Sequence, residues 1–120
     1  MQLRSNVTPL HRDDWPRGAS LEASVRQHLA SLFASQHFDA SSRSRDFLRY
    51  VVDEGLAGRG AALNQAAIAM SVFARKADFD PLLDPIVRVQ AGRLRRSLER
   101  YYLLTTEQHA LRIELPKGSY

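Results

Sequence analysis

The sequence predicts a mainly α-helical domain with a small C-terminal β-hairpin, and three observations favour this fold class. Apolar residues recur at helical spacing in successive segments, Leu111, Ile113 and Leu115 alternate with charged residues near the end, and 44% of the 120 residues are hydrophobic. This amount of apolar material suits one core. We therefore expect one domain over residues 20–120, preceded by a flexible arm over residues 1–19.

The expected arm combines Pro9, Pro16 and Gly18 with alternating charges and has neither helical nor strand periodicity. Trp15 is its only large aromatic side chain and could attach it to the domain. We expect an irregular or disordered segment, whose removal should change the melting temperature little.

Candidate N-caps mark the first three predicted helices, and these are Ser20, Ser41 or Ser42, and Asn64. An apolar stripe at helical spacing follows each cap, over residues 21–33, 47–56 and 68–73. Gly58 and Gly60 are suited to end the second helix, because glycine takes the left-handed conformation that is common at helix C-termini.

Two Asp-Pro pairs precede a fourth, longer helix. In Asp80-Pro81 and in Asp84-Pro85 a capping carboxylate comes before a proline, which is well tolerated at the first helical position. We therefore expect two successive helix starts, the second opening a helix over residues 85–103. Its predicted core face comprises Val87, Ala91, Leu94, Leu98 and Tyr101.

Positive charge is concentrated in this fourth helix. The chain has 17 basic and 13 acidic residues, for a net charge of +4. Residues 84–104 contain five arginines against only Asp84 and Glu99. A basic helix is typical of nucleic-acid-binding proteins, although a solvated charged face has the same composition.

Several functional classes lack their sequence signals. Without cysteine there is neither a disulfide nor a thiolate nucleophile. We find no phosphate-binding loop, catalytic triad pattern or paired carboxylates, and Asp78, Asp80 and Asp84 lack the spacing, glycine and glutamate of a calcium loop. The sequence also has no signal-peptide or membrane-spanning apolar run. We expect a cytoplasmic protein that is not an enzyme and needs no cofactor or metal.

Two stretches resemble the DNA-binding domains of response regulators: VRVQAGRLRRSL over residues 87–98 and KGSY over residues 117–120. The chain is still more similar to the bacterial winged-helix domain that precedes tetratricopeptide repeats. That similarity rests on FLRYVV at 47–52, FDP at 79–81, DPIVRV at 84–89 and IELPKGSY at 113–120. It departs from the family in having Asn64-Gln65-Ala66 in place of Lys-Glu-Tyr, and a second wing strand is missing.

The resemblance implies a winged helix-turn-helix fold and a transcriptional regulator that inserts the helix over residues 85–103 into the DNA major groove. It places Val89, Gln90 and Arg93 where such domains contact bases. Phosphate contacts are expected from Arg95, Arg96 and Arg100, and Arg88 and Lys117 are further expected DNA-binding residues.

The expected partner is double-stranded DNA, bound by a homodimer. Candidate contacts between subunits are the apolar residues that one helix face cannot all bury: Ile86, Tyr102, Leu103 and Leu104. The alternative is a winged-helix adaptor that binds another protein and not DNA, since an exposed Ile86 and Val89 could equally contact a protein.

Overall fold

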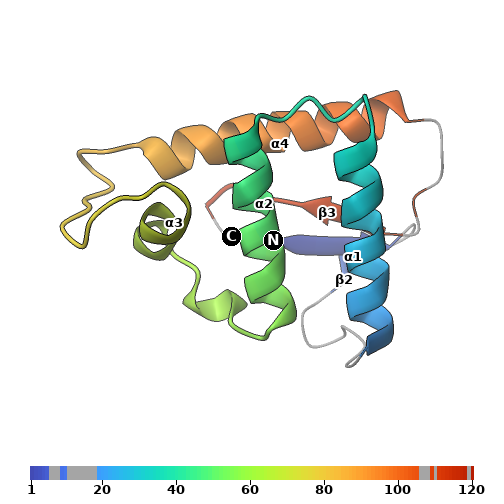
Figure 1. The fold of residues 1–120 in the computed structure, drawn as a ribbon, viewed down its shortest axis with the longest axis horizontal. Coiled ribbons are helices and arrows are strands. Elements are labelled where there is room, and N and C mark those ends of the chain that lie inside the picture. The colour runs from blue at the N-terminus through green and yellow to red at the C-terminus, as the bar shows by residue number, and fades with distance from the viewer. Residues whose placement is uncertain (6–8, 11–18, 106–108, 110, 119) are drawn as a thin grey trace.

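The computed structural model describes residues 1–5, 9, 10, 19–105, 109, 111–118 and 120 (Figure 1). Its elements are β1 (Gln2–Ser5), β2 (Pro9–Leu10), α1 (Ala19–Ala34), α2 (Ser42–Leu56), a 3-10 turn η2 (Gly60–Ala62), α3 (Gln65–Val72), α4 (Ile86–Leu104) and β3 (Leu111–Glu114). The mainly helical fold that the sequence predicts is thus confirmed. Helices α1 and α2 lie side by side, α4 crosses both, and the strands lie beneath them (Figure 1).

The sheet is antiparallel, has the strand order β2-β1-β3, and contradicts the predicted C-terminal hairpin. Strand β3 pairs with β1 from the start of the chain, with Leu3 opposite Ile113. Both side chains are almost completely buried. A four-residue alternation at the N-terminus is too short to identify a strand by pattern, and its partner lies more than a hundred residues away, so this pairing escapes local reasoning.

Residues 1–5 are therefore not part of an irregular arm. Met1 and Leu3 point into the core, while Arg4 on the outer face of the sheet forms an ion pair of 3.4 Å with Glu114. The rest of the expected arm, including Trp15, lies largely outside the described residues.

Two of the predicted N-caps are confirmed. The backbone N–H of Ser44 donates to Ser41 Oγ at 3.2 Å, and that of Ala67 donates to Asn64 Oδ1 at 2.8 Å. Gly58 follows the end of α2 with φ of 81°, the left-handed conformation expected there. Ser20 is not a cap, because α1 already begins at Ala19.

The first predicted helix start, at Pro81, is wrong. Residues 81–83 form a turn, in which Asp80 Oδ1 accepts from the N–H of Leu82 at 2.9 Å. A helix from Pro81 would need the N–H of residue 85, but Pro85 has none and disfavours a helical conformation at the residue before it. Helix α4 instead begins at Ile86, whose N–H donates to Asp84 Oδ1 at 3.1 Å.

The core face of α4 is as predicted. Val87, Ala91, Leu94, Leu98 and Tyr101 are all buried. They pack in one cluster with the apolar faces of α1, α2 and α3 and with the inner face of the sheet.

Two side chains of α4 connect it to the edge of β3 that faces away from β1. The N–H of Ile113 donates to the Tyr102 hydroxyl at 2.8 Å, and Arg95 Nε donates to the carbonyl of Leu115 at 2.7 Å. Residues 113 and 115 direct their backbone groups to the same edge, because successive residues of a strand alternate. An additional strand could pair with this edge only by displacing Tyr102 and Arg95.

His28 on α1 completes this connection and makes it sensitive to acid. Its Nε2 lies 2.9 Å from the Tyr102 hydroxyl, whose oxygen accepts from the N–H of Ile113, so the two side chains form one hydrogen-bonded group with the backbone of β3. Burial, and secondarily the charge of His109, lowers the pKa of His28 to about 4. The ring of His109 meets that of His28 edge-on, with centroids 5.4 Å apart.

Because the folded protein binds this proton less readily than the unfolded chain, stability should be lost as the pH falls from about 6.5 towards 4. We expect this residue to account for about 1–2 kcal/mol, discounted for the partial solvent exposure of the ring. Thermal unfolding of the wild type and of His28→Gln between pH 7.5 and 4 measures it. A variant with the same loss of stability on acidification as the wild type would contradict this expectation.

Candidate nucleic-acid interface

A stripe of side chains runs along the side of α4 that faces away from the core. Its members are Val89, Arg93, Arg96, Arg100 and Leu103, and all are exposed. Their spacing of four, three, four and three residues keeps them on one line of a helix with 3.6 residues per turn. We call these five residues the α4 stripe. Three adjacent arginines on it form the most exposed cationic row that the helix presents.

Arg93 and Arg96 are distinguished by their lack of partners. Six of the thirteen described arginines form ion pairs: for example, Arg26 with Asp53, Arg59 with Glu54 and Arg75 with Asp84, at 2.7–2.8 Å. By contrast, neither Arg93 nor Arg96 forms a hydrogen bond or ion pair with any residue that the structure describes. Arg43 on α2 is similarly unpaired within the described part of the chain. The positive charge of the α4 stripe is therefore available to an external anion.

Gly92 directly precedes Arg93 and lies about one turn before Arg96 on α4. A glycine inside a helix costs roughly 0.5–1 kcal/mol relative to alanine. A Cβ at this position would meet only Arg96 Nη1, at an ordinary contact distance of 3.7 Å. Core packing does not require a glycine here, and the missing side chain leaves the helix backbone bare beside Arg96.

Gln90 is a correction to the predicted site. It was expected to contact bases, but it is only 8% exposed, and its Oε1 has no hydrogen-bond partner among the described residues. On the helix it lies next to the core line of Val87, Leu94 and Tyr101, which explains its burial. Its position in the family-like pattern did not reveal this orientation.

Arg95 is a second correction. Its guanidinium donates to the carbonyls of Leu115 at 2.7 Å and Pro116 at 3.3 Å, and so fixes the segment after β3 against α4. A guanidinium that already holds two backbone carbonyls has fewer N–H groups left for a phosphate than the unpaired Arg96 has. The sequence pattern alone could not distinguish it from the neighbouring Arg96.

Arg88 and Lys117 remain accessible near the stripe. Arg88 is exposed, and its Nη2 lies 3.5 Å from the carbonyl of Pro81, which is at the limit of a hydrogen bond. Lys117 is exposed in the turn after β3, where Gly118 has φ of 80°. Both can contact an anion without breaking an ion pair.

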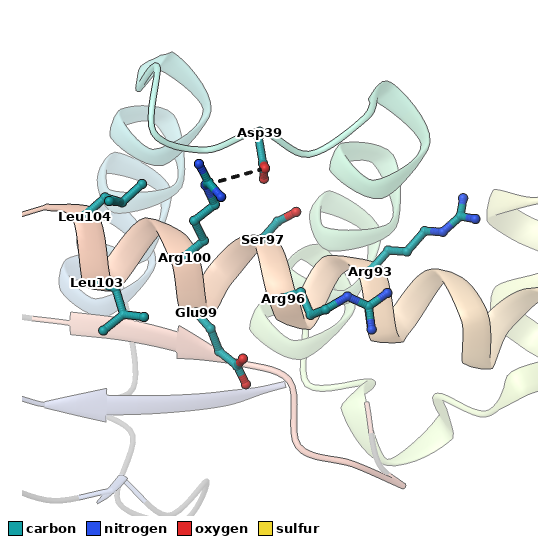
Figure 2. Close-up of a pocket in the computed structure, with 8 residues that line it drawn as sticks. All are labelled: Asp39, Arg93, Arg96, Ser97, Glu99, Arg100, Leu103 and Leu104. Atoms are coloured by element: carbon teal, nitrogen blue, oxygen red, sulfur yellow. Dashed lines mark ion pairs between the residues drawn. The ribbon is translucent and has the colours of Figure 1, made fainter.

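Arg100 differs from its neighbours because it faces an acid. Figure 2 shows the carboxylate of Asp39, on the connection between α1 and α2, directed at the Arg100 guanidinium, at a distance of 3.8 Å. The two residues line an open hollow of about 680 Å³ together with Arg93, Arg96 and Leu104. No sequence signal singled out Asp39, because this contact joins residues 61 positions apart.

The residues expected at a subunit contact divide into two groups. Tyr102 is half-buried and bonded to Ile113 and His28, and Ile86 packs against the core. Leu103 and Leu104 remain exposed at the end of α4. Two further leucines, Leu82 and Leu83, are 87% and 84% exposed in the turn that precedes α4.

No protein-family model, curated protein or solved structure matches the chain. Among the described residues, no helix is both long and apolar enough to cross a bilayer.

Proposed function

We propose that this protein binds double-stranded DNA as a winged-helix regulator, with the N-terminal half of α4 in the major groove. The observation that carries the proposal is the pair of uncompensated arginines, Arg93 and Arg96, on a stripe that faces away from the core. Arginine pairs with guanine O6 and N7 in the major groove and with backbone phosphates, so this row has the chemistry of a DNA contact.

The geometry supports separate roles for the individual side chains. Arg93 is assigned to a base edge, Val89 to a thymine methyl group, and Arg96 with Arg88 and Lys117 to phosphates. No DNA contact is assigned to Gln90, which is buried, or to Arg95, which donates to the carbonyl of Leu115. The bare surface at Gly92 allows the helix backbone to approach the groove closely.

We further propose that the protein binds as a homodimer. A single helix contacts few phosphates, and two copies would double the number of counterions released. Leu103 and Leu104 are the members of the expected subunit contact that remain exposed. Two-fold symmetry would then place half-sites about one helical turn apart, roughly 10–10.5 base pairs.

A protein-binding adaptor is the second candidate function. The feature that favours it is the pair of almost fully exposed leucines at positions 82 and 83. Adjacent apolar side chains in a turn that is fixed by Asp80 and Asp84 are suited to dock in a partner's hydrophobic groove.

Measurement of the affinity for duplex DNA against salt concentration distinguishes the two functions. For a DNA-binding protein we expect the affinity to fall steeply between 50 and 200 mM salt, by orders of magnitude if six or more phosphates are contacted. An affinity for DNA that is absent at low salt, or independent of salt, would favour the adaptor.

Substitutions in the α4 stripe test the assigned roles. On a site selected from random sequence, Arg93→Ala should cost about 1–3 kcal/mol and relax the base preference, whereas Arg96→Ala should weaken binding to all sequences alike. Arg59→Ala is the matched control, since it removes the same charge three residues after the C-terminal end of α2. That end of α2 points away from α4 (Figure 1). Equal, sequence-independent losses for Arg93→Ala and Arg96→Ala would place Arg93 on phosphate.

A further inference from the structure

The connection between α1 and α2 passes over the C-terminal half of α4 and is fixed there by Arg45. The Arg45 guanidinium donates to the carbonyls of Phe33 at 2.7 Å, Phe38 at 3.0 Å and Ala40 at 3.0 Å. These three acceptors flank Asp39 on both sides along the chain. The position of the Asp39 backbone relative to α4 is therefore set by a half-buried side chain of α2.

Asp39 is the acidic residue that this connection presents to the α4 stripe. Its carboxylate lies 3.8 Å from Arg100 Nε, and no hydrogen bond or ion pair joins it to another described residue (Figure 2). Arg93 and Arg96, nearer the start of the helix, have no such neighbour. The stripe is thus cationic and uncompensated in its first half, and partly neutralised in its second half.

The dimensions of the groove indicate what this asymmetry does. The 19 residues of α4 extend over about 28 Å at 1.5 Å per residue, whereas the major groove is only about 12 Å wide. Only about nine residues, separated by eight rises of 1.5 Å, can lie within the groove when the helix crosses it. The residues from Arg88 to Arg96 fill that length, and Arg100 falls beyond it, where a phosphate would be the available contact.

We propose, building on the proposed function, that Asp39 restricts DNA contact to the N-terminal half of α4 by competing with phosphate for Arg100. The guanidinium lies 3.8 Å from the carboxylate in the free protein, and in the complex it keeps this ion pair instead of contacting a phosphate. Asp39 is thus a positioning residue that sets where along α4 the backbone of DNA can bind. Asp39 thereby lowers the affinity for DNA, but it also limits α4 to one position in the major groove.

Asp39→Asn tests the proposal, because it removes the charge and preserves the size of the side chain. We expect the affinity for duplex DNA at 50 mM salt to rise about threefold, in keeping with the small energies of exposed ion pairs. The slope of log affinity against log salt should steepen by about 0.9, as Arg100 gains one phosphate. In an Arg100→Ala background the same substitution should change affinity by less than about 1.5-fold, while Arg100→Ala alone should have little effect.

The matched control is Asp46→Asn, which removes an exposed aspartate that pairs with Arg49 on α2. If Asp39→Asn and Asp46→Asn raise the affinity equally, or if Asp39→Asn acts undiminished without Arg100, the effect is one of net charge and the proposal is overturned. A wild type that binds DNA with a steep salt dependence, but whose affinity Asp39→Asn leaves unchanged, overturns the role of Asp39 alone. A wild type that does not bind DNA overturns this role and the proposed function together.

Discussion

Leu3→Ala is expected to lower the free energy of unfolding by about 2–4 kcal/mol. The side chain of Leu3 is fully buried, lies opposite Ile113 in the sheet, and belongs to the cluster that also contains Leu94 and Leu98 of α4. Truncation would remove most of an apolar side chain from a close-packed site and leave a cavity. A loss of this size is large for a domain whose total stability is on the order of 5–15 kcal/mol.

Urea unfolding followed by circular dichroism measures this change, and Arg4→Ala is the control in the same strand. Arg4 lies on the outer face, with its side chain 44% exposed, and its ion pair with Glu114 should be worth less than about 1 kcal/mol. If Leu3→Ala proved as mild as Arg4→Ala, β1 would not be part of the folded domain. Deletion of residues 1–5 should destabilise the protein at least as much as Leu3→Ala, because it also leaves β3 without its partner.

The helices could be predicted because their signals are local. The buried face of α4 follows from the spacing of Val87, Leu94 and Leu98 alone, and Ser41 and Asn64 cap the turns that directly follow them. The accessible arginines could be predicted as a group from the composition of one helix. Amphipathic periodicity determines which side of a helix is buried, but it does not determine what the other side contacts.

The errors at β3 and Arg95 depend on contacts between distant segments. The partner of β3 lies at the other end of the chain. Arg95 donates to the carbonyls of Leu115 and Pro116, and these hydrogen bonds direct its side chain away from the candidate site. Gln90 lies at the boundary between the buried and the exposed face of α4. A small error in the predicted position of this boundary decides whether its side chain is expected to be buried or exposed. The contacts of β3 with β1 and of Arg95 with the segment after β3 form only once the tertiary structure brings these segments together, so no local pattern encodes them.

Arg45→Ala is expected to destabilise the protein by about 2–4 kcal/mol. Its guanidinium donates to three backbone carbonyls, one in the last turn of α1 and two in the connection to α2. A hydrogen bond from a charged donor contributes about 1.5–3 kcal/mol, and water can partly replace it at a half-buried site. The same guanidinium lies 5.5 Å and 5.2 Å from the ring centres of Phe33 and Phe38, where a cation–π interaction adds about 0.5–1 kcal/mol. The control is Arg43→Ala. Arg43 lies two residues before Arg45, on the exposed side of α2, and is unpaired within the described residues, so its loss should cost less than about 0.5 kcal/mol.

The same variant connects stability to DNA binding. Once its carbonyls lose Arg45, the connection that carries Asp39 is no longer fixed over α4, and Arg100 should become available to phosphate. At a temperature where Arg45→Ala is fully folded, its affinity for DNA should therefore rise like that of Asp39→Asn, and combining the two substitutions should add little further affinity. Thermal unfolding and salt titrations of the single and double variants measure both effects. A stability equal to that of Arg43→Ala would mean that Arg45 does not fix the connection, whereas a destabilised variant with unchanged affinity would separate the position of Asp39 from DNA binding.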